Sequence, residues 1–255
     1  MVGHVGHPRE RPGKKPEAAG PPLAPSSYNT GVKRSSRERA DGESVSELTT
    51  ARLSVYLRSL EALEASGINT VSSRGLAEQF RLNAAQIRKD LAHFGEFGVR
   101  GVGYYVKDLR RHLREILGLD RQLKVVILGA GNLGLALADY PGFRHDGFDV
   151  VALLDTARDK VGQYSRSGVP IRHARELERL AERERLDIAV LAVPAESAQE
   201  VVDAVVGAGV KAILNFTPGS LRVPKGVKLK NVDLTVSLES LSFFLARGVD
   251  VPEVS

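Results

Sequence analysis

The residues best suited to chemistry are three glycines and one aspartate in the middle of the chain. The segment KVVILGAGNLG runs from an apolar stretch into Gly129, Gly131 and Gly134. In a turn between strand and helix, the first glycine permits the tight bend, the second lets the backbone approach a pyrophosphate, and the third lets the helix pack closely on the strand. The phosphates then lie at a helix N-terminus. We therefore expect a dinucleotide cradle formed by the glycine turn, which consists of Gly129, Ala130, Gly131, Asn132, Leu133 and Gly134.

A second apolar stretch, FDVVALLD, ends in Asp155, which lies 21 residues past Gly134. This is near the spacing at which a carboxylate hydrogen-bonds the adenosine ribose in dinucleotide-binding folds. A carboxylate there would repel a 2′-phosphate, so the pattern favours NAD(H) over NADP(H). Arg158 lies close enough to Asp155 to leave NADP(H) open.

Residues for chemistry beyond binding are scarce. The chain has no cysteine, which excludes disulfides, zinc fingers and thiol nucleophiles. It shows no nucleophile elbow, metal-ligand cluster or pair of catalytic carboxylates, and we expect none of its six histidines at a strand end. An oxidoreductase needs a proton-transferring group beside the nicotinamide and usually a second domain that closes over it. A sensor needs only to bind its dinucleotide, so this composition favours a sensor.

The elements that must position the cradle are short apolar strands alternating with helices. This alternation predicts an α/β fold, with a Rossmann-type doubly wound parallel sheet whose ligand crevice lies at the carboxyl ends of the strands. After the two stretches above, we expect a helix over 176–185, a strand over 187–194, a helix over 195–209, a strand over 210–218 and a closing helix over 238–248. Pro194 and the turn over 215–218 then fall at the strand ends.

Upstream of the sheet, three amphipathic helices are predicted. The first follows a cap at Thr49 or Thr50 and ends at Gly67, with an apolar stripe of Leu53, Tyr56, Leu57, Leu60 and Leu63. The second is capped by Ser72 or Ser73, and the third begins at a capping box of Asn83 and Gln86 and ends at Gly95. The last two are joined by a tight polar turn, as in a helix-turn-helix. The glycine-rich segment GEFGVRGVGYYV suits a β-hairpin wing, and a basic helix follows it.

The third helix carries polar residues around its apolar stripe of Ile87, Leu91 and Phe94. We expect Gln86, Arg88, Lys89 and Asp90 on its exposed side, where Arg can hydrogen-bond guanine, Gln can hydrogen-bond adenine and Lys can neutralise phosphate. Arg100 lies in the predicted wing. The alternative is a small helical packing module with an incidental charged face.

Charge and composition divide the chain into four parts. The net charge of +5 lies entirely in the N-terminal half, with +3 in residues 1–46, +3 in residues 47–118 and −1 in residues 119–255. We expect a disordered basic tail over 1–46, a winged-helix DNA-binding domain over 47–118, a Rossmann NAD(H)-binding domain over 119–237, and a C-terminal dimerisation helix and tail over 238–255. With no apolar leader and no membrane-length apolar run, we expect a cytoplasmic protein.

Together these segments resemble the Rex family of redox-sensing transcriptional repressors. The resemblance runs from about Thr50 to Arg247 and rests on the segments VSSRGLAEQF, QIRKDLAHFGEFGVRGVGYYV, ILGAGNLGLALADYPGF, ILNFTPGSL and VDLTVSLESL. It implies a homodimer whose C-terminal helix is swapped between subunits. It also implies binding to palindromic operator DNA when NADH is scarce and release when NADH binds.

The resemblance also implies residue roles. Arg88 and Lys89 would face DNA, Arg52 and Ser73 would contact its backbone, and Asp155 would hold the ribose. The residues near the nicotinamide would be Val193, Pro194, Asn215 and Phe216. Three switch positions would change contacts between states: Arg58, Tyr140 and Asp233. Leu234 stands where some relatives have an aromatic residue after the switch aspartate. We therefore expect the recognition of nicotinamide to differ in detail from those relatives.

Two other functions remain open from the residues alone. An NAD-dependent oxidoreductase with an accessory N-terminal domain predicts steady NADH turnover with a small carbonyl compound. A constitutive DNA-binding protein, whose Rossmann domain only dimerises, predicts DNA release that is indifferent to the NADH/NAD⁺ ratio.

Overall fold

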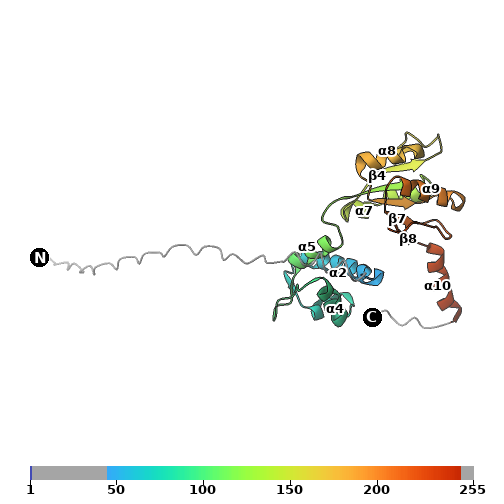
Figure 1. Ribbon diagram of the computed structural model, residues 1–255. Helices are drawn as coiled ribbons and strands as arrows, with labels where there is room; N and C mark the ends of the chain where they lie inside the picture. Colours follow the sequence, from blue (N-terminus) through green and yellow to red (C-terminus); the bar gives the residue numbers. More distant parts are fainter. Residues whose placement is uncertain (2–44, 248–255) are drawn as a thin grey trace. The chain divides into compact units, whose positions relative to one another are not determined.

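The computed structural model describes Met1 and residues 45–247 (Figure 1). The predicted tail over 1–46 lies almost entirely outside the described residues, as does the chain after Arg247. Two bodies follow one another in the described chain, a mainly helical one and one built on a parallel sheet. None of the described helices combines the length and apolar character that a membrane crossing requires.

The N-terminal body contains four helices and a two-stranded antiparallel sheet in which β1 pairs with β2. Its core is one cluster of buried apolar side chains, and the predicted stripe from Leu53 to Leu63 is buried in full. The elements are α2 (Glu47–Ala65), β1 (Thr70–Val71), α3 (Ser73–Phe80), α4 (Ala84–Phe94), β2 (Tyr104–Tyr105) and α5 (Val106–Ile116).

Helix α2 begins earlier than predicted. Its N-cap is Ser46, whose side chain accepts a hydrogen bond from the Thr49 backbone N–H at 3.1 Å, so the caps predicted at Thr49 or Thr50 are wrong. Ser46 has an extended backbone and lies one residue before Glu47, and this is the geometry that an N-cap requires. Gly67, with φ of +75°, follows the helix end as predicted.

The helix-turn-helix is confirmed, with one change in its caps. Ser72 caps α3 by accepting from the Gly75 N–H, and Asn83 caps α4 by accepting from the N–H groups of Ala85 and Gln86. The Gln86 side chain does not return to the cap as a capping box requires; it donates to Asp90 instead. The wing is a tight turn in which the backbones of Val99 and Gly103 exchange two hydrogen bonds.

The second body is a six-stranded sheet in the order β5-β4-β3-β6-β7-β8, and every adjacent pair is parallel. This is the doubly wound order. From β3 to β5 each new strand is added toward one edge of the sheet, and from β6 to β8 toward the other edge, so the strand order reverses between β3 and β6. Its strands are β3 (Leu123–Leu128), β4 (Phe148–Asp155), β5 (Ile171–His173), β6 (Ile188–Leu191), β7 (Ala212–Asn215) and β8 (Lys228–Asn231). Strands β5 and β8 were missed by the sequence analysis because they are short and lie at the sheet edges.

Helices cover both faces of this sheet, because successive residues of a buried strand point to opposite sides. Val126 and Leu128 pack with residues of α8 and α9, whereas Val125 and Ile127 pack with residues of α6. Figure 1 shows α8 and α9 beside the strands. The helical elements are α6 (Asn132–Ala138), α7 (Pro141–His145), η1 (Ala174–Glu176), α8 (Leu177–Glu184), α9 (Ala195–Gly207) and α10 (Leu234–Arg247).

Helix α10 starts one turn before the predicted closing helix. Asp233 causes this, because one of its carboxylate oxygens accepts from the N–H groups of Thr235 and Val236 at 2.9 and 3.2 Å and so caps the first turn. No residue of α10 is buried within the described chain.

Candidate dinucleotide site and nucleic-acid interface

The glycine turn lies at the point where the strand order reverses. Gly129 follows β3 with φ of +101°, and a Cβ on it would meet the carbonyl of Ala192 and the side chain of Val193, beyond the end of β6. A Cβ on Gly134 would overlap the carbonyl oxygen of Gly129. These two glycines therefore allow the turn and the close packing of α6 on β3, as the sequence predicted.

Gly131 differs from its two neighbours in the motif. Its backbone is extended, it occupies the N-cap position of α6, and beyond its two chain neighbours no atom of the described residues lies within 4 Å of where its Cβ would be. Nothing in the protein therefore requires a glycine there, whereas a pyrophosphate lying on the turn would. Helix α6 has only 7 residues and no side-chain cap. The backbone of the turn, rather than a long helix dipole, must provide most of the phosphate binding.

Asp155 ends β4 and is already hydrogen-bonded to the glycine turn. Its Oδ2 accepts from the Ala130 N–H at 2.8 Å, and its Oδ1 accepts from the Ala157 N–H at the same distance. Lys160 Nζ lies 3.2 Å from Oδ2. Burial raises the pKa of Asp155, but these three donors outweigh burial and leave the pKa below its usual range. The carboxylate is therefore ionised at neutral pH, the form that accepts hydrogen bonds from a ribose diol.

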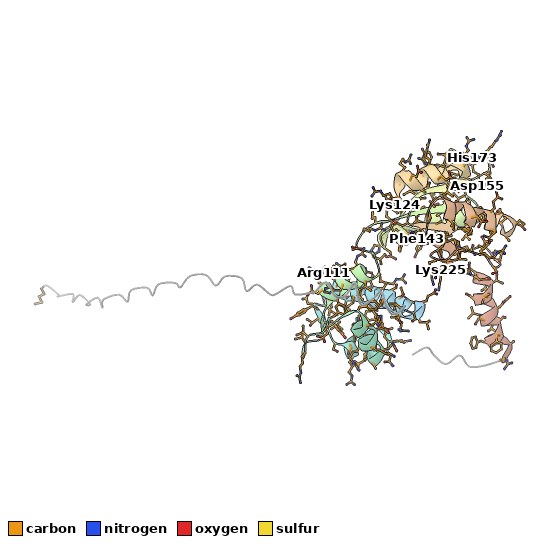
Figure 2. The ribbon with its side chains drawn as sticks, in the orientation of Figure 1. Arg111, Lys124, Phe143, Asp155, His173 and Lys225 are labelled. Carbon is orange, nitrogen blue, oxygen red and sulfur yellow. The ribbon has the colours of Figure 1, made fainter. Side chains whose placement is uncertain are left out.

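Two details of this corner differ from the sequence analysis. The cation that contacts Asp155 is Lys160, which the sequence analysis did not single out, whereas Arg158 is exposed and forms no hydrogen bond or ion pair with Asp155. The prediction that no histidine ends a strand is wrong for His173, the last residue of β5 and the register partner of Asp155 (Figure 2). Its Nδ1 accepts from the Arg175 N–H, so the ring caps the 3-10 helix η1.

The residues predicted near the nicotinamide do lie at the carboxyl ends of β6 and β7. Val193 and Pro194 follow β6, and Pro194 is the N-cap residue of α9. Asn215 ends β7 and is fully buried, and its amide bonds Thr217 and Asn231. Asn215 therefore shapes this edge of the sheet through protein contacts, and Phe216 follows it, partly buried against the core.

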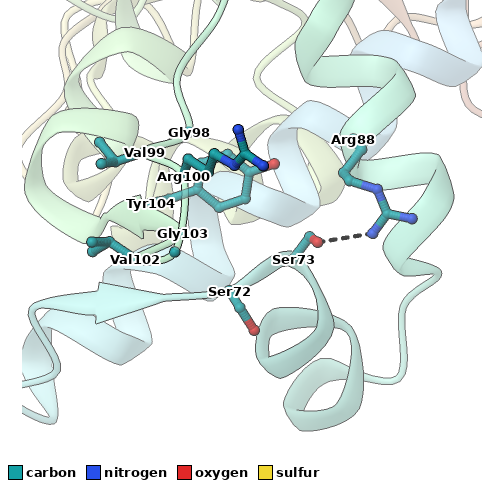
Figure 3. Close-up of a pocket in the computed structure, with 10 residues that line it drawn as sticks. Ser72, Ser73, Arg88, Gly98, Val99, Arg100, Val102, Gly103 and Tyr104 are labelled. Atoms are coloured by element: carbon teal, nitrogen blue, oxygen red, sulfur yellow. Dashed lines mark hydrogen bonds between the residues drawn. The ribbon is translucent and has the colours of Figure 1, made fainter.

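In the N-terminal body, an open hollow of about 550 Å³ lies between the start of α3, the side of α4 and the wing (Figure 3). Arg88 reaches across from α4, and its Nη1 donates to the Ser73 hydroxyl at 2.9 Å. Arg100 belongs to the wing and lines the same hollow. Lys89, next to Arg88, is exposed. The hollow has cationic and hydroxyl groups on its rim, the chemistry that binds phosphate and base edges.

Asp90 is the residue of α4 that the sequence analysis placed wrongly. It is buried, with 4% of its surface exposed, because it faces α2 rather than solvent. Arg52 donates to it through Nε at 2.6 Å and Nη2 at 2.8 Å, and the Tyr56 hydroxyl at 2.9 Å and the Gln86 amide at 2.7 Å complete the set. Two residues predicted to contact DNA, Arg52 and Gln86, are thus bound to one buried carboxylate.

Hydrogen bonding in this network shifts the pKa values of its members. Arg52, with help from Gln86 and Tyr56, outweighs burial and lowers the pKa of Asp90. Burial, followed by the Asp90 carboxylate, raises the pKa of Tyr56 to about 12. Because folding lowers the pKa of Asp90, the network stabilises the fold above the pKa of an unfolded aspartate. That stabilisation is lost as the pH falls through the lower pKa of the folded state.

The three switch positions are not joined to one another by any hydrogen bond or ion pair within residues 45–247. Arg58 is exposed on α2, and Tyr140 is 56% exposed at the start of α7, in edge contact with Phe143. Asp233 caps α10. Residues 45–247 contain no group of three or more His, Asp or Glu side chains that could hold a metal ion.

Comparison with known proteins accounts for both bodies. Residues 44–92 match the family model described as putative DNA-binding protein N-terminus, and residues 120–219 match the CoA binding domain model. The redox-sensing transcriptional repressor Rex of Desulfitobacterium hafniense is 48% identical over 199 residues, 78% of this chain and 94% of that protein. Rex of Streptomyces coelicolor is 44% identical over 210 residues, 82% of this chain and 81% of that protein.

Solved structures agree with these relatives. A complex of RSP with β-NAD⁺ and operator DNA aligns with a TM-score of 0.76 at 40% identity, covering 80% of this chain and 94% of that one. RSP in complex with β-NADH aligns with a TM-score of 0.71 at 38% identity, covering 81% and 96%. RSP is described as a Rex-family repressor.

Proposed function

The chain belongs to the Rex family of redox-sensing transcriptional repressors, and from that premise we propose that it binds palindromic operator DNA as a homodimer and releases it when NADH binds. It acts as a repressor and not as an enzyme, with NAD(H) as its regulatory ligand. Its place of action is the cytoplasm, where the DNA and the dinucleotide pool meet.

One observation carries this proposal: a single chain holds a glycine turn left open at Gly131 beside the ionised Asp155, and also a helix-turn-helix with a hollow edged by Arg88 and Arg100. The first set suits an adenine dinucleotide and the second suits duplex DNA. The complexes of RSP with operator DNA and with β-NADH support assigning both ligands to this chain.

The response to NADH requires differential binding. NADH must bind the DNA-incompetent dimer more tightly than the DNA-competent one, because a ligand with equal affinity for both would shift nothing. NAD⁺ is expected to have a weaker or opposite preference. Operator DNA must in turn weaken NADH binding by the same factor, since coupling between two binding sites is reciprocal.

The dimer is proposed on the basis of α10. A helix with seven large apolar side chains, all of them exposed, needs a partner, and a second copy of this chain, exchanging the helix, supplies one. In such a dimer Arg58, Tyr140 and Asp233 would meet across subunits and change their contacts between states. This is consistent with the lack of any bond joining them within the described chain.

A mobility-shift titration at fixed salt tests the function. The probe is a duplex that the wild-type chain selects from a random-sequence library, and NADH and NAD⁺ are varied in ratio at constant total concentration. We expect release as the NADH fraction rises, and NADH titrations that give a weaker affinity with the duplex than without it. Release that ignores the ratio, or one NADH affinity in both conditions, would refute the redox switch.

A further inference from the structure

Asp90 is a buried anion on α4, although a helix in a DNA-binding surface needs to be cationic. Its carboxylate accepts four hydrogen bonds from three side chains, which is about the number that a carboxylate can accept. A buried charge satisfied in this way is difficult to disturb, because removing a donor leaves the charge without compensation. The four groups therefore act as one unit.

The geometry of Arg52 shows what this unit achieves. The Nε and Nη2 atoms both face Asp90, in the two-pronged pairing that matches a guanidinium to a carboxylate, and Nη2 also donates to the Thr49 hydroxyl at 3.2 Å. None of these bonds uses Nη1, and the Tyr56 hydroxyl, bound to the same carboxylate, lies beside the guanidinium. Asp90 thus immobilises the side chain and leaves one edge of the guanidinium available.

Arg52 is positioned to use that edge. Its side chain is 35% exposed although its partner is buried, so it extends from the core to the surface beside α4. A free arginine would lose side-chain entropy when it binds a phosphate, and an arginine already held by Asp90 has lost most of that freedom on folding. The charge of Asp90 cancels that of Arg52 at long range, so the benefit is geometric.

Gln86 is held by the same carboxylate. Its amide nitrogen donates to Asp90 Oδ1 at 2.7 Å, so this group is half-buried and turned toward α2. If the Gln86 amide left Asp90, a hydrogen bond to a buried charge would be lost, and such bonds are stronger than those between neutral groups. This disfavours the bidentate hydrogen bonding to adenine that the sequence suggested for Gln86.

We propose that Asp90 is a positioning residue for DNA binding, which holds Arg52 so that its Nη1 edge meets a DNA phosphate and holds Gln86 inward, away from a bidentate contact with a base. This inference rests on the proposed function, because it assumes that α4 and its surroundings bind operator DNA. It differs from a purely structural role for Asp90, in which the network would only join α2 to α4.

A double-mutant cycle separates the two roles. Asp90→Asn, Arg52→Ala and the double variant are compared with wild type for affinity to the selected duplex, for NADH affinity and for thermal unfolding, below the melting temperature of each. We expect D90N to weaken duplex binding by about tenfold in the wild-type background and less than about twofold in the R52A background. NADH affinity should stay unchanged, because Asp155 and the glycine turn belong to the other body.

Two further variants keep the test decisive. Ser59→Ala is the matched control, since Ser59 is a buried polar residue of α2 that bonds Val55 and not Asp90, and its duplex affinity should equal that of wild type. Arg52→Lys keeps the surface charge but loses the paired donors. If D90N does not fold, a loss of duplex affinity in R52K with its melting temperature retained supports the proposal.

Three results would overturn the inference: wild-type duplex affinity in folded D90N, multiplicative losses from D90N and R52A, or unchanged affinity in R52K. A wild-type chain that selects no duplex, or that keeps its duplex at every NADH/NAD⁺ ratio, would instead count against the proposed function.

Discussion

At the scale of single residues, the structure shows how contacts already made within the protein limit what a side chain offers to a ligand. Asp155 accepts hydrogen bonds from Ala130, Ala157 and Lys160 within the protein. A ribose diol must therefore share this carboxylate or displace Lys160. Within residues 45–247, the hydrogen-bond partner of Arg88 is the Ser73 hydroxyl, a neutral group that a phosphate or guanine can replace at low cost.

Replacing Asp155 with alanine should weaken NADH binding by about 2 kcal/mol or more, since hydrogen bonds to a charged acceptor are lost. Operator binding without NADH should remain, and isothermal titration together with a mobility shift would measure both. Asp159→Ala is the control, because it removes an exposed carboxylate four residues away. An equal loss of NADH and operator binding in D155A would indicate misfolding and not a ribose contact.

Replacing Arg88 with alanine should lower specific operator affinity by roughly 1–3 kcal/mol, the usual worth of a base-reading arginine. Arg111→Ala removes the same charge from α5, where Arg111 pairs with Asp108 and Glu115 and does not line the hollow. Fluorescence anisotropy at one salt concentration compares the two variants. Similar affinities in both would remove Arg88 from the base-reading set.

At the scale of elements, caps and close approaches determine where each element begins. Ser46 and Asp233 each start a helix earlier than apolar periodicity suggested, because one oxygen that accepts from free N–H groups is enough to add a turn. In the glycine turn, close packing of α6 requires a glycine at position 134, whereas Gly131 faces open space.

This division predicts opposite effects for two alanine substitutions in the turn. Gly131→Ala should leave the melting temperature unchanged and weaken NADH binding on the order of tenfold, because its methyl group would meet only a nucleotide. Gly134→Ala should destabilise the domain by roughly 1–3 kcal/mol, because the methyl group would force α6 away from the Gly129 carbonyl. Thermal unfolding and NADH titration measure both, and full NADH affinity in G131A would contradict the cradle.

At the scale of the whole molecule, α10 is the helix whose apolar surface is not covered by any other part of the described chain. Leu234, Leu238, Leu241 and Leu245 fall at helical spacing on one face, and all are at least 60% exposed. Exposed apolar surface of this extent marks an interaction site, and a homodimer matches the proposed palindromic operator.

Leu241→Glu should shift the chain from dimer to monomer and weaken operator binding, since a carboxylate would be buried in the apolar interface at a cost of several kcal/mol. Glu239→Lys changes a charge on the opposite side of α10 and should leave the dimer intact. Analytical ultracentrifugation over a range of concentrations measures the mass of each. A dimeric L241E would remove this face from the interface.

The sequence by itself determined the two folds, the glycine cradle with Asp155, and the apolar stripes of the helix-turn-helix, because these depend on local periodicity and on residues close together in the chain. Only the tertiary structure decided which polar groups are already paired. Asp90 was expected to be exposed but is buried against Arg52, which lies 38 residues away, and the cation that pairs with Asp155 is Lys160, which no sequence pattern singled out. Edge strands β5 and β8 likewise became visible only through pairing. Long-range pairing depends on how the elements pack, and no local pattern in the chain encodes it.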